Sequence, residues 1–172
     1  NFRKSVKSLS SDNVIIGEIW DDATDYLLGD MYDSVMNYVF RTAVLGYAKG
    51  DKTATEATKE LEKIRERYPQ EAFYAMMNLV GSHDTARLLS FLDGVPDDRD
   101  DKSFDAAFPT YDKTSDNAKK MQQLVALIQM TYPGAPTIYY GDELGMTGSD
   151  DPDNRRAMEW GKCNKELVEY YA

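Results

Sequence analysis

The sequence has a single cysteine, Cys163, and a single histidine, His83, among its 172 residues. One cysteine excludes an intrachain disulfide, which fits a reducing cytoplasmic setting and fits a secreted protein without disulfides equally well. One histidine excludes centres that need several histidine ligands, such as the HD-type metal phosphohydrolases that the stretch "SHDTAR" would otherwise suggest. We therefore predict no metal centre of this kind, and a structural calcium ion bound by carboxylates stays open. The sequence implies no organic cofactor.

Long apolar runs and basic surface are also lacking. No apolar run reaches the roughly 18 residues that a membrane-spanning helix needs, so we predict no membrane span. Lysine and arginine total 20 against 30 aspartate and glutamate, giving a formal net charge of −10. Nucleic acids and anionic membranes both require a basic binding surface, so neither is an expected partner. A neutral substrate such as a sugar is compatible with this charge.

The sequence does contain short apolar runs that alternate with helical patterns. Strands are predicted at 13–20, 34–38, 73–80 and from 135 into a loop that ends at 145. Helices are predicted at 1–11, 40–48, 53–68 and 117–131, with a polar loop at 93–116. This alternation predicts an α/β fold with a parallel sheet. Four such units make half of an eight-stranded barrel.

Polar or aromatic residues stand where each predicted strand ends, namely Glu18, Tyr38, His83 with Asp84, and Asp142 with Glu143. Parallel α/β proteins place their chemistry at the carboxyl ends of the strands. We therefore expect these side chains to share one rim. Asp142 and Glu143 are interpreted as carboxylates that organise their loop.

Five segments, in this order, carry a family resemblance: "GEIW", "GDMYDSVMNYVF", "GSHDTAR", "PGAPTIYYGDELG" and "DPDNRRAMEW". Together they resemble the α-amylase family of glycoside hydrolases, and most closely its neopullulanase, cyclomaltodextrinase and maltogenic amylase group. The resemblance extends from about Asn13 to Trp160. It implies that residues 1–172 form the C-terminal half, strands five to eight, of a (β/α)8 TIM barrel, with the N-terminal half absent.

The resemblance also implies catalytic roles. Glu18 would be the general acid/base, Asp84 would stabilise the distorted, positively charged sugar ring, and His83 would bind sugar hydroxyls. The family's aspartate nucleophile lies in a G-x-R-x-D motif on the fourth strand, and this sequence has no such motif. The nucleophile is expected upstream of Asn1, so the isolated chain is expected to be inactive.

The substrate implied by the resemblance is an α-glucan oligosaccharide or a cyclodextrin. Trp20 and Tyr38 would offer flat faces to sugar rings, and Asp151 with Arg155 would bind the glucose next to the cleavage site. The full-length protein would cleave α-1,4 bonds, and α-1,6 bonds and a homodimeric state stay open.

Retaining glycoside hydrolysis explains why two kinds of carboxyl group are needed. One carboxylate attacks the sugar, and a second carboxyl group must hold a proton for the leaving oxygen. A glutamate at the end of an apolar strand, beside Ile19 and Trp20, is expected to be partly desolvated, which favours its protonated form. Gly17 is expected to clear space for substrate or backbone.

Alternatives to a catalytic role are simple. Glu18 can be a solvated strand end, His83 structural, Trp20 part of the core, and Asp151 with Arg155 a surface ion pair. The run 97–101 is interpreted as a solvated loop, and Met121, Leu124 and Ile128 as core. A serine hydrolase lacks its G-x-S-x-G motif here, and an EF-hand counted from Asp151 has Arg156 where glycine is required. A non-catalytic half-barrel that binds carbohydrate or self-associates stays open.

Overall fold

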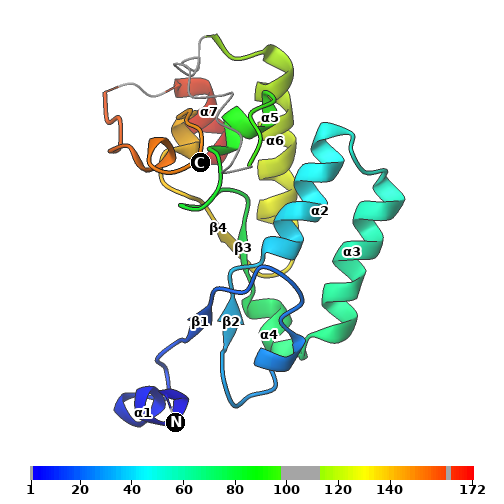
Figure 1. The fold of residues 1–172 in the computed structure, drawn as a ribbon, viewed down its shortest axis with the longest axis vertical. Helices are drawn as coiled ribbons and strands as arrows, with labels where there is room; N and C mark the ends of the chain where they lie inside the picture. The colour runs from blue at the N-terminus through cyan, green and yellow to red at the C-terminus, as the bar shows by residue number, and fades with distance from the viewer. Residues whose placement is uncertain (1, 98–112, 162–163) are drawn as a thin grey trace.

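A computed structural model describes residues 2–97, 113–161 and 164–172, so Cys163 and most of the predicted polar loop lie outside the described part. Its strands are β1 (Ile16–Gly17), β2 (Ser34–Val35), β3 (Met77–Leu79) and β4 (Ala135–Thr137). β1 pairs with β2 and β3 with β4, both in parallel, and a parallel bridge between Met36 and Met77 joins the two pairs. The predicted parallel arrangement is confirmed, in the order β1-β2-β3-β4 (Figure 1).

The α-helices are α1 (Phe2–Leu9), α2 (Tyr38–Lys49), α3 (Ala54–Arg67), α4 (Gln70–Ala75), α5 (Leu88–Leu92), α6 (Asp116–Thr131) and α7 (Lys165–Tyr171). Short 3₁₀ turns cover Thr24–Tyr26, Asp142–Leu144 and Asp153–Arg155. The predicted helices at 1–11, 40–48, 53–68 and 117–131 are confirmed. α2 packs between α3 and α6 to one side of the strands (Figure 1). Within the described ranges, no helix combines the length and the apolar character that crossing a membrane requires.

The strands predicted at 13–20, 34–38 and 73–80 were too long, and two of them overlap helices. The segment 73–80 begins in helix α4, whose start after Pro69 the apolar pattern concealed. Tyr38 was predicted to end a strand but is the first residue of α2. The Asn37 side chain explains this switch, because it accepts a hydrogen bond from the Phe40 N–H at 3.1 Å and so caps the helix.

Burial of the first strand region also differs from the prediction. Ile15 is buried at 6% exposure, but Val14 and Ile16 are 66% and 50% exposed. Within the described part of the chain β1 pairs only with β2, so side chains on its other flank have nothing to pack against. Gly17 is needed for a different reason than expected: a β-carbon there would lie 2.4 Å from the Tyr32 ring.

The core lies between the strands and the helices that cover them. Its fully buried members include Phe40 and Leu45 of α2, Leu88 of α5 and Val125 of α6. Burying each such side chain contributes about 1.5 to 3 kcal/mol. The expected core residue Leu124 is 38% exposed, since α6 turns a different face inward.

That inward face of α6 carries two buried glutamines. Gln129 is fully buried, and its side-chain N–H groups donate to Asn78 O of β3 and Thr137 O of β4, both at 2.8 Å. Gln122 donates to Asp142 O at 2.7 Å. These amides tie α6 to the strands and to the loop that follows β4.

A capping box at the start of α3 gives the first testable prediction. The Thr53 hydroxyl accepts the Glu56 N–H at 3.3 Å, and the Glu56 carboxylate accepts the Thr53 N–H at 2.8 Å. We expect Thr53→Ala to lower the free energy of unfolding by about 1 kcal/mol, measured by urea denaturation. Thr55→Ala, at an exposed position inside the same helix, is the matched control and should not destabilise. Equal stability of the unchanged chain and Thr53→Ala would contradict the role of the cap.

Candidate active site

Three side chains from two strand ends converge on one point. Glu18 follows β1, and His83 with Asp84 lies in the loop after β3. One oxygen of Glu18, one ring nitrogen of His83 and one oxygen of Asp84 all lie within 4.8 Å of one another. The structure therefore brings together the two predicted catalytic carboxyl groups and the predicted hydroxyl-binding histidine. Glu18 is exposed, so the desolvation expected from Ile19 and Trp20 is not found in the described residues.

Asp84 is held by contacts on both its backbone and its carboxylate. The Asp84 N–H donates to Ser82 Oγ at 3.1 Å. His83 Nε2 lies 3.3 Å from Asp84 Oδ2, and Arg155 Nη2 donates to Asp84 Oδ1 at 3.1 Å. The carboxylate is thus pinned at one oxygen by a guanidinium while its other oxygen faces the histidine. A fixed negative charge of this kind can stabilise a positive charge that develops beside it.

Trp20 and Tyr38 form one aromatic stack next to this cluster. Their ring centroids are 3.7 Å apart and their planes differ by 14°. Tyr38 is only 2% exposed because Trp20 covers it, whereas Trp20 is 48% exposed. Trp20 therefore forms the solvent-exposed face of this stack.

The Tyr38 hydroxyl lies 3.1 Å from Ser82 Oγ. Burial raises the pKa of Tyr38, the hydrogen bond with Ser82 opposes this, and the negative charges of Glu18 and Asp84 add to the rise. The phenol therefore stays protonated at neutral pH and supports the serine that receives the Asp84 N–H. Tyr38 links the aromatic stack to the loop that carries Asp84.

The segment after β4 returns to the same site. Arg155 contacts Asp151 Oδ1 through Nε at 3.3 Å, in addition to its bond to Asp84. The predicted pair of Asp151 and Arg155 is thus present and lies beside the carboxyl cluster. Their neighbour Asn154, which the sequence pattern did not single out, donates to the backbone oxygens of His83 at 2.9 Å and Thr85 at 2.8 Å.

A buried ion pair behind the site joins Arg87, which the sequence analysis did not single out, to Asp142, which it interpreted as organising its loop. Arg87 and Asp142 are 0% and 2% exposed, and Arg87 Nη1 lies 3.6 Å from Asp142 Oδ1. The Arg87 guanidinium also lies over the rings of Tyr139 and Tyr140, at 4.4 and 4.5 Å from their centroids. The sequence does contain a signal for this pair, because Arg87 ends the motif "HDTAR" and Asp142 lies in the motif "YYGDE". It does not reveal that both side chains are buried.

The cluster of Glu18, His83 and Asp84 also has the donor types of a metal site. The Arg155 guanidinium already compensates Asp84, which disfavours a cation at the same carboxylate. The expected absence of a resident metal stays a prediction.

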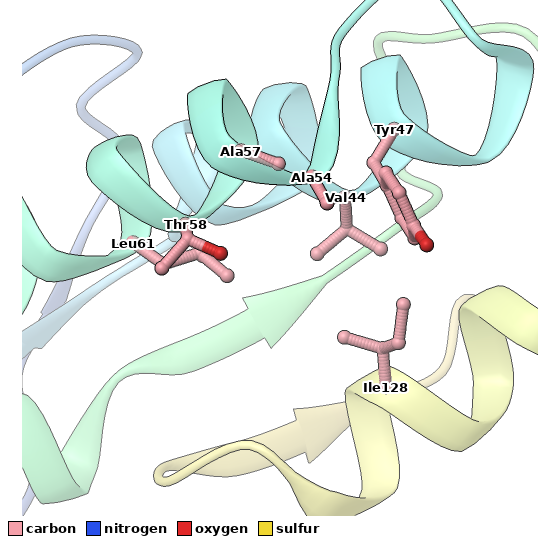
Figure 2. Close-up of a pocket in the computed structure, with 7 residues that line it drawn as sticks. All are labelled: Val44, Tyr47, Ala54, Ala57, Thr58, Leu61 and Ile128. Atoms are coloured by element: carbon pink, nitrogen blue, oxygen red, sulfur yellow. The ribbon is translucent and has the colours of Figure 1, made fainter.

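An apolar cavity of about 250 Å³ lies elsewhere, between α2, α3 and α6. Figure 2 shows Val44 and Tyr47 of α2 and residues of α3 facing Ile128 of α6 across it. Its remaining lining residues are Ala54, Ala57, Thr58 and Leu61. It contains no carboxylate and no residue of the strand-end cluster, so we interpret it as a packing gap between helices.

Parallel strands with convergent carboxylates at their C-terminal ends define an α/β protein with its site at the strand rim. The sequence-family model described as the alpha amylase catalytic domain matches residues 1–169 of this chain. The chain therefore belongs to the alpha-amylase family. It is 43% identical to neopullulanase 2 of Thermoactinomyces vulgaris over 173 residues, covering 99% of this chain and 26% of that protein. It is 41% identical to a cyclomaltodextrinase of Geobacillus thermopakistaniensis, covering 98% of this chain and 25% of that protein.

Solved structures agree with these relatives. A cyclomaltodextrinase structure aligns with a TM-score of 0.79 at 37% identity, covering 99% of this chain and 26% of the other. The cyclic α-maltosyl-(1→6)-maltose hydrolase of Arthrobacter globiformis, in complex with maltose, aligns with a TM-score of 0.78 at 30% identity. That alignment covers 99% of this chain and 34% of the other. The chain therefore spans about a quarter of the length of the curated relatives named above.

Proposed function

We propose that this chain is the C-terminal half, strands five to eight, of the catalytic barrel of a retaining α-glucan hydrolase. The full-length protein would cleave α-1,4-glucosidic bonds, and α-1,6 bonds as a further specificity, in cyclodextrins, pullulan or starch. The observation that carries the proposal is the convergence of Glu18, His83 and Asp84 at the strand ends. The names of the relatives, neopullulanase and cyclomaltodextrinase, support the substrate class.

The proposed roles follow from the geometry of the cluster. Glu18 is exposed and free to reach a glycosidic oxygen, so it would donate the proton to the leaving sugar and later accept one from water. The Asp84 carboxylate, held by Arg155, would stabilise the positive charge on the ring. His83 would bind hydroxyls of the same ring.

Substrate contacts are proposed on both sides of this centre. Trp20 would stack on a sugar ring through its exposed face, and Tyr38 would support it from behind. Asp151 and Arg155 would bind the adjoining glucose. No organic cofactor is needed, because two carboxyl groups suffice for this chemistry.

The nucleophile is proposed to lie upstream, in a G-x-R-x-D segment roughly 30 to 40 residues before Glu18, the size of one βαβ step. We therefore expect the isolated 172-residue chain to release no glucose or maltose from cyclodextrin or pullulan, whereas the full-length protein does. Measuring reducing sugar from both proteins, with β-linked cellulose oligosaccharides as the control substrate, tests the proposal. Turnover by the isolated chain, or none by the full-length protein on any α-glucan, would refute it.

The alternative is a non-catalytic half-barrel that binds carbohydrate or associates with itself. Val14, just before β1, and Ile16, within β1, are exposed, and among the described residues β1 has one edge without a partner strand. Such an edge can pair with another chain, which favours self-association. Light scattering of the isolated chain with and without maltoheptaose measures self-association and its response to carbohydrate, separately from hydrolysis.

A further inference from the structure

Asn154 occupies an unusual position behind the carboxyl cluster. Its side chain is fully buried in the 3₁₀ turn Asp153–Arg155. Both N–H groups of its amide are used: one donates to His83 O at 2.9 Å and the other to Thr85 O at 2.8 Å. Carbonyl oxygens only accept hydrogen bonds, so the amide nitrogen must face them.

The two accepting carbonyls belong to the residues immediately before and after Asp84. The His83 carbonyl lies in the peptide group directly before Asp84 and the Thr85 carbonyl lies in the peptide group after Thr85, so the amide holds the backbone on both sides of Asp84 and with it the direction of the Asp84 Cα–Cβ bond. The third backbone contact, from the Asp84 N–H to Ser82 Oγ at 3.1 Å, acts in the same direction. One buried amide therefore holds the stretch of backbone from which the Asp84 carboxylate projects.

Arg155 cannot replace this amide. Arg155 also donates to His83 O, at 3.1 Å, and binds the Asp84 carboxylate directly, but its side chain is 42% exposed. A long, exposed arginine adjusts to movements of the loop, whereas a short, buried amide resists them. Asn154 holds the backbone around Asp84 in place, and Arg155 binds the Asp84 carboxylate and adjusts to its position.

We propose that Asn154 is a positioning residue that holds Asp84 in the orientation needed to stabilise the charged sugar ring. The inference rests on the proposed function, because Asp84 acts on substrate only if the full-length protein is an α-glucan hydrolase. Misplacing a catalytic group by about 1 Å costs on the order of 100-fold in rate. We expect Asn154→Ala in the full-length protein to lower kcat for maltoheptaose about 10- to 100-fold, with KM changed less than about 3-fold.

The chain provides a matched control in Gln129. Its amide is also fully buried and also donates to two backbone oxygens, Asn78 O and Thr137 O, but it joins β3 to β4 away from the cluster. Gln129→Ala removes the same number of hydrogen bonds from the fold. We expect it to lower the unfolding temperature as Asn154→Ala does, with kcat per folded molecule within about 2-fold of the unchanged protein.

Activity is measured per folded molecule, with the folded fraction taken from circular dichroism and thermal unfolding. Asn154→Asp keeps the side-chain volume but points carboxylate oxygens at two carbonyls, and it is the second variant if Asn154→Ala does not fold. Its kcat should fall at least as far. Unchanged kcat in an Asn154 variant, or equal kcat losses in the Asn154 and Gln129 variants, would overturn the inference. An unmodified protein that hydrolyses no α-glucan would overturn the proposed function as well.

Discussion

Glu18→Gln in the full-length protein is expected to reduce turnover of cyclodextrin and maltooligosaccharides by about 100- to 10,000-fold, the usual contribution of a general acid/base. Glutamine has nearly the same shape but no proton of suitable acidity for the leaving oxygen. Substrate binding should change little, because the exposed Glu18 side chain can be replaced by an amide without loss of packing. The measurement is kcat and KM from release of reducing sugar.

The leaving group provides a sharper test of the same role. A 4-nitrophenyl α-maltoside needs little protonation to depart, so its first chemical step should be affected far less by Glu18→Gln than that of maltoheptaose. Glu66→Gln, on the exposed side of α3, is the matched control and should leave both rates unchanged. Equal losses on the two substrates would show that Glu18 is not the proton donor.

Much of the site follows from the local sequence, because strand ends and short motifs are local features. The alternation of apolar runs and helical patterns predicted the parallel strands, and the resemblance placed Glu18, His83 and Asp84 together. The strands themselves were predicted too long. β1 and β2 have two residues each, and an apolar run before a strand is indistinguishable in sequence from the buried face of a short helix such as α4.

The groups that support the site were missed for a physical reason. Asn154, Arg87 and Gln129 are polar residues that are 0% exposed, and each is stabilised by partners far away in the chain. Asn154 and Thr85, for example, are separated by 69 positions. A polar residue is predicted to be exposed when only its sequence is known. The fold supplies the hydrogen-bond acceptors that offset the free-energy cost of burying it. Asp97 was likewise interpreted as solvated but pairs with Arg41 at 2.7 Å, and 98–101 lie outside the described residues.

The buried pair behind the site leads to the second large prediction. Burial raises the pKa of Asp142 to about 7 from its ordinary value of 3.8; the Arg87 cation opposes this rise and Glu143 adds to it. Asp142 also lies against the loop that carries Asp84, since a β-carbon at Gly81 would be 2.2 Å from Asp142 Oδ2. Its protonation state therefore bears on the packing directly behind the site.

The sign of the stability effect follows from proton linkage. An acid whose pKa is higher in the folded state binds its proton more tightly there, so its stabilising contribution is complete below about pH 3.8 and is lost as the pH rises toward 7. Asparagine does not titrate. Raising the pH from 4 to 8 should therefore stabilise Asp142→Asn relative to the unchanged protein. The difference between their free energies of unfolding should change by up to about 4 kcal/mol over this range.

Asp33→Asn is the control with the opposite sign. Burial acts to raise the pKa of Asp33, but hydrogen bonds from Arg3 and Lys7 lower it below its ordinary value. The stabilising contribution of that carboxylate is therefore present above the ordinary pKa and is lost as the pH falls through the lowered pKa. Urea denaturation of the three proteins from pH 8 down to well below pH 3.8, the ordinary pKa of both carboxyl groups, separates the two cases. A shift against Asp142→Asn as the pH rises would mean that the Arg87 cation outweighs burial and keeps Asp142 ionised. Arg87 and Asp142 would then form a permanent ion pair behind Asp84, and the packing there would not respond to pH.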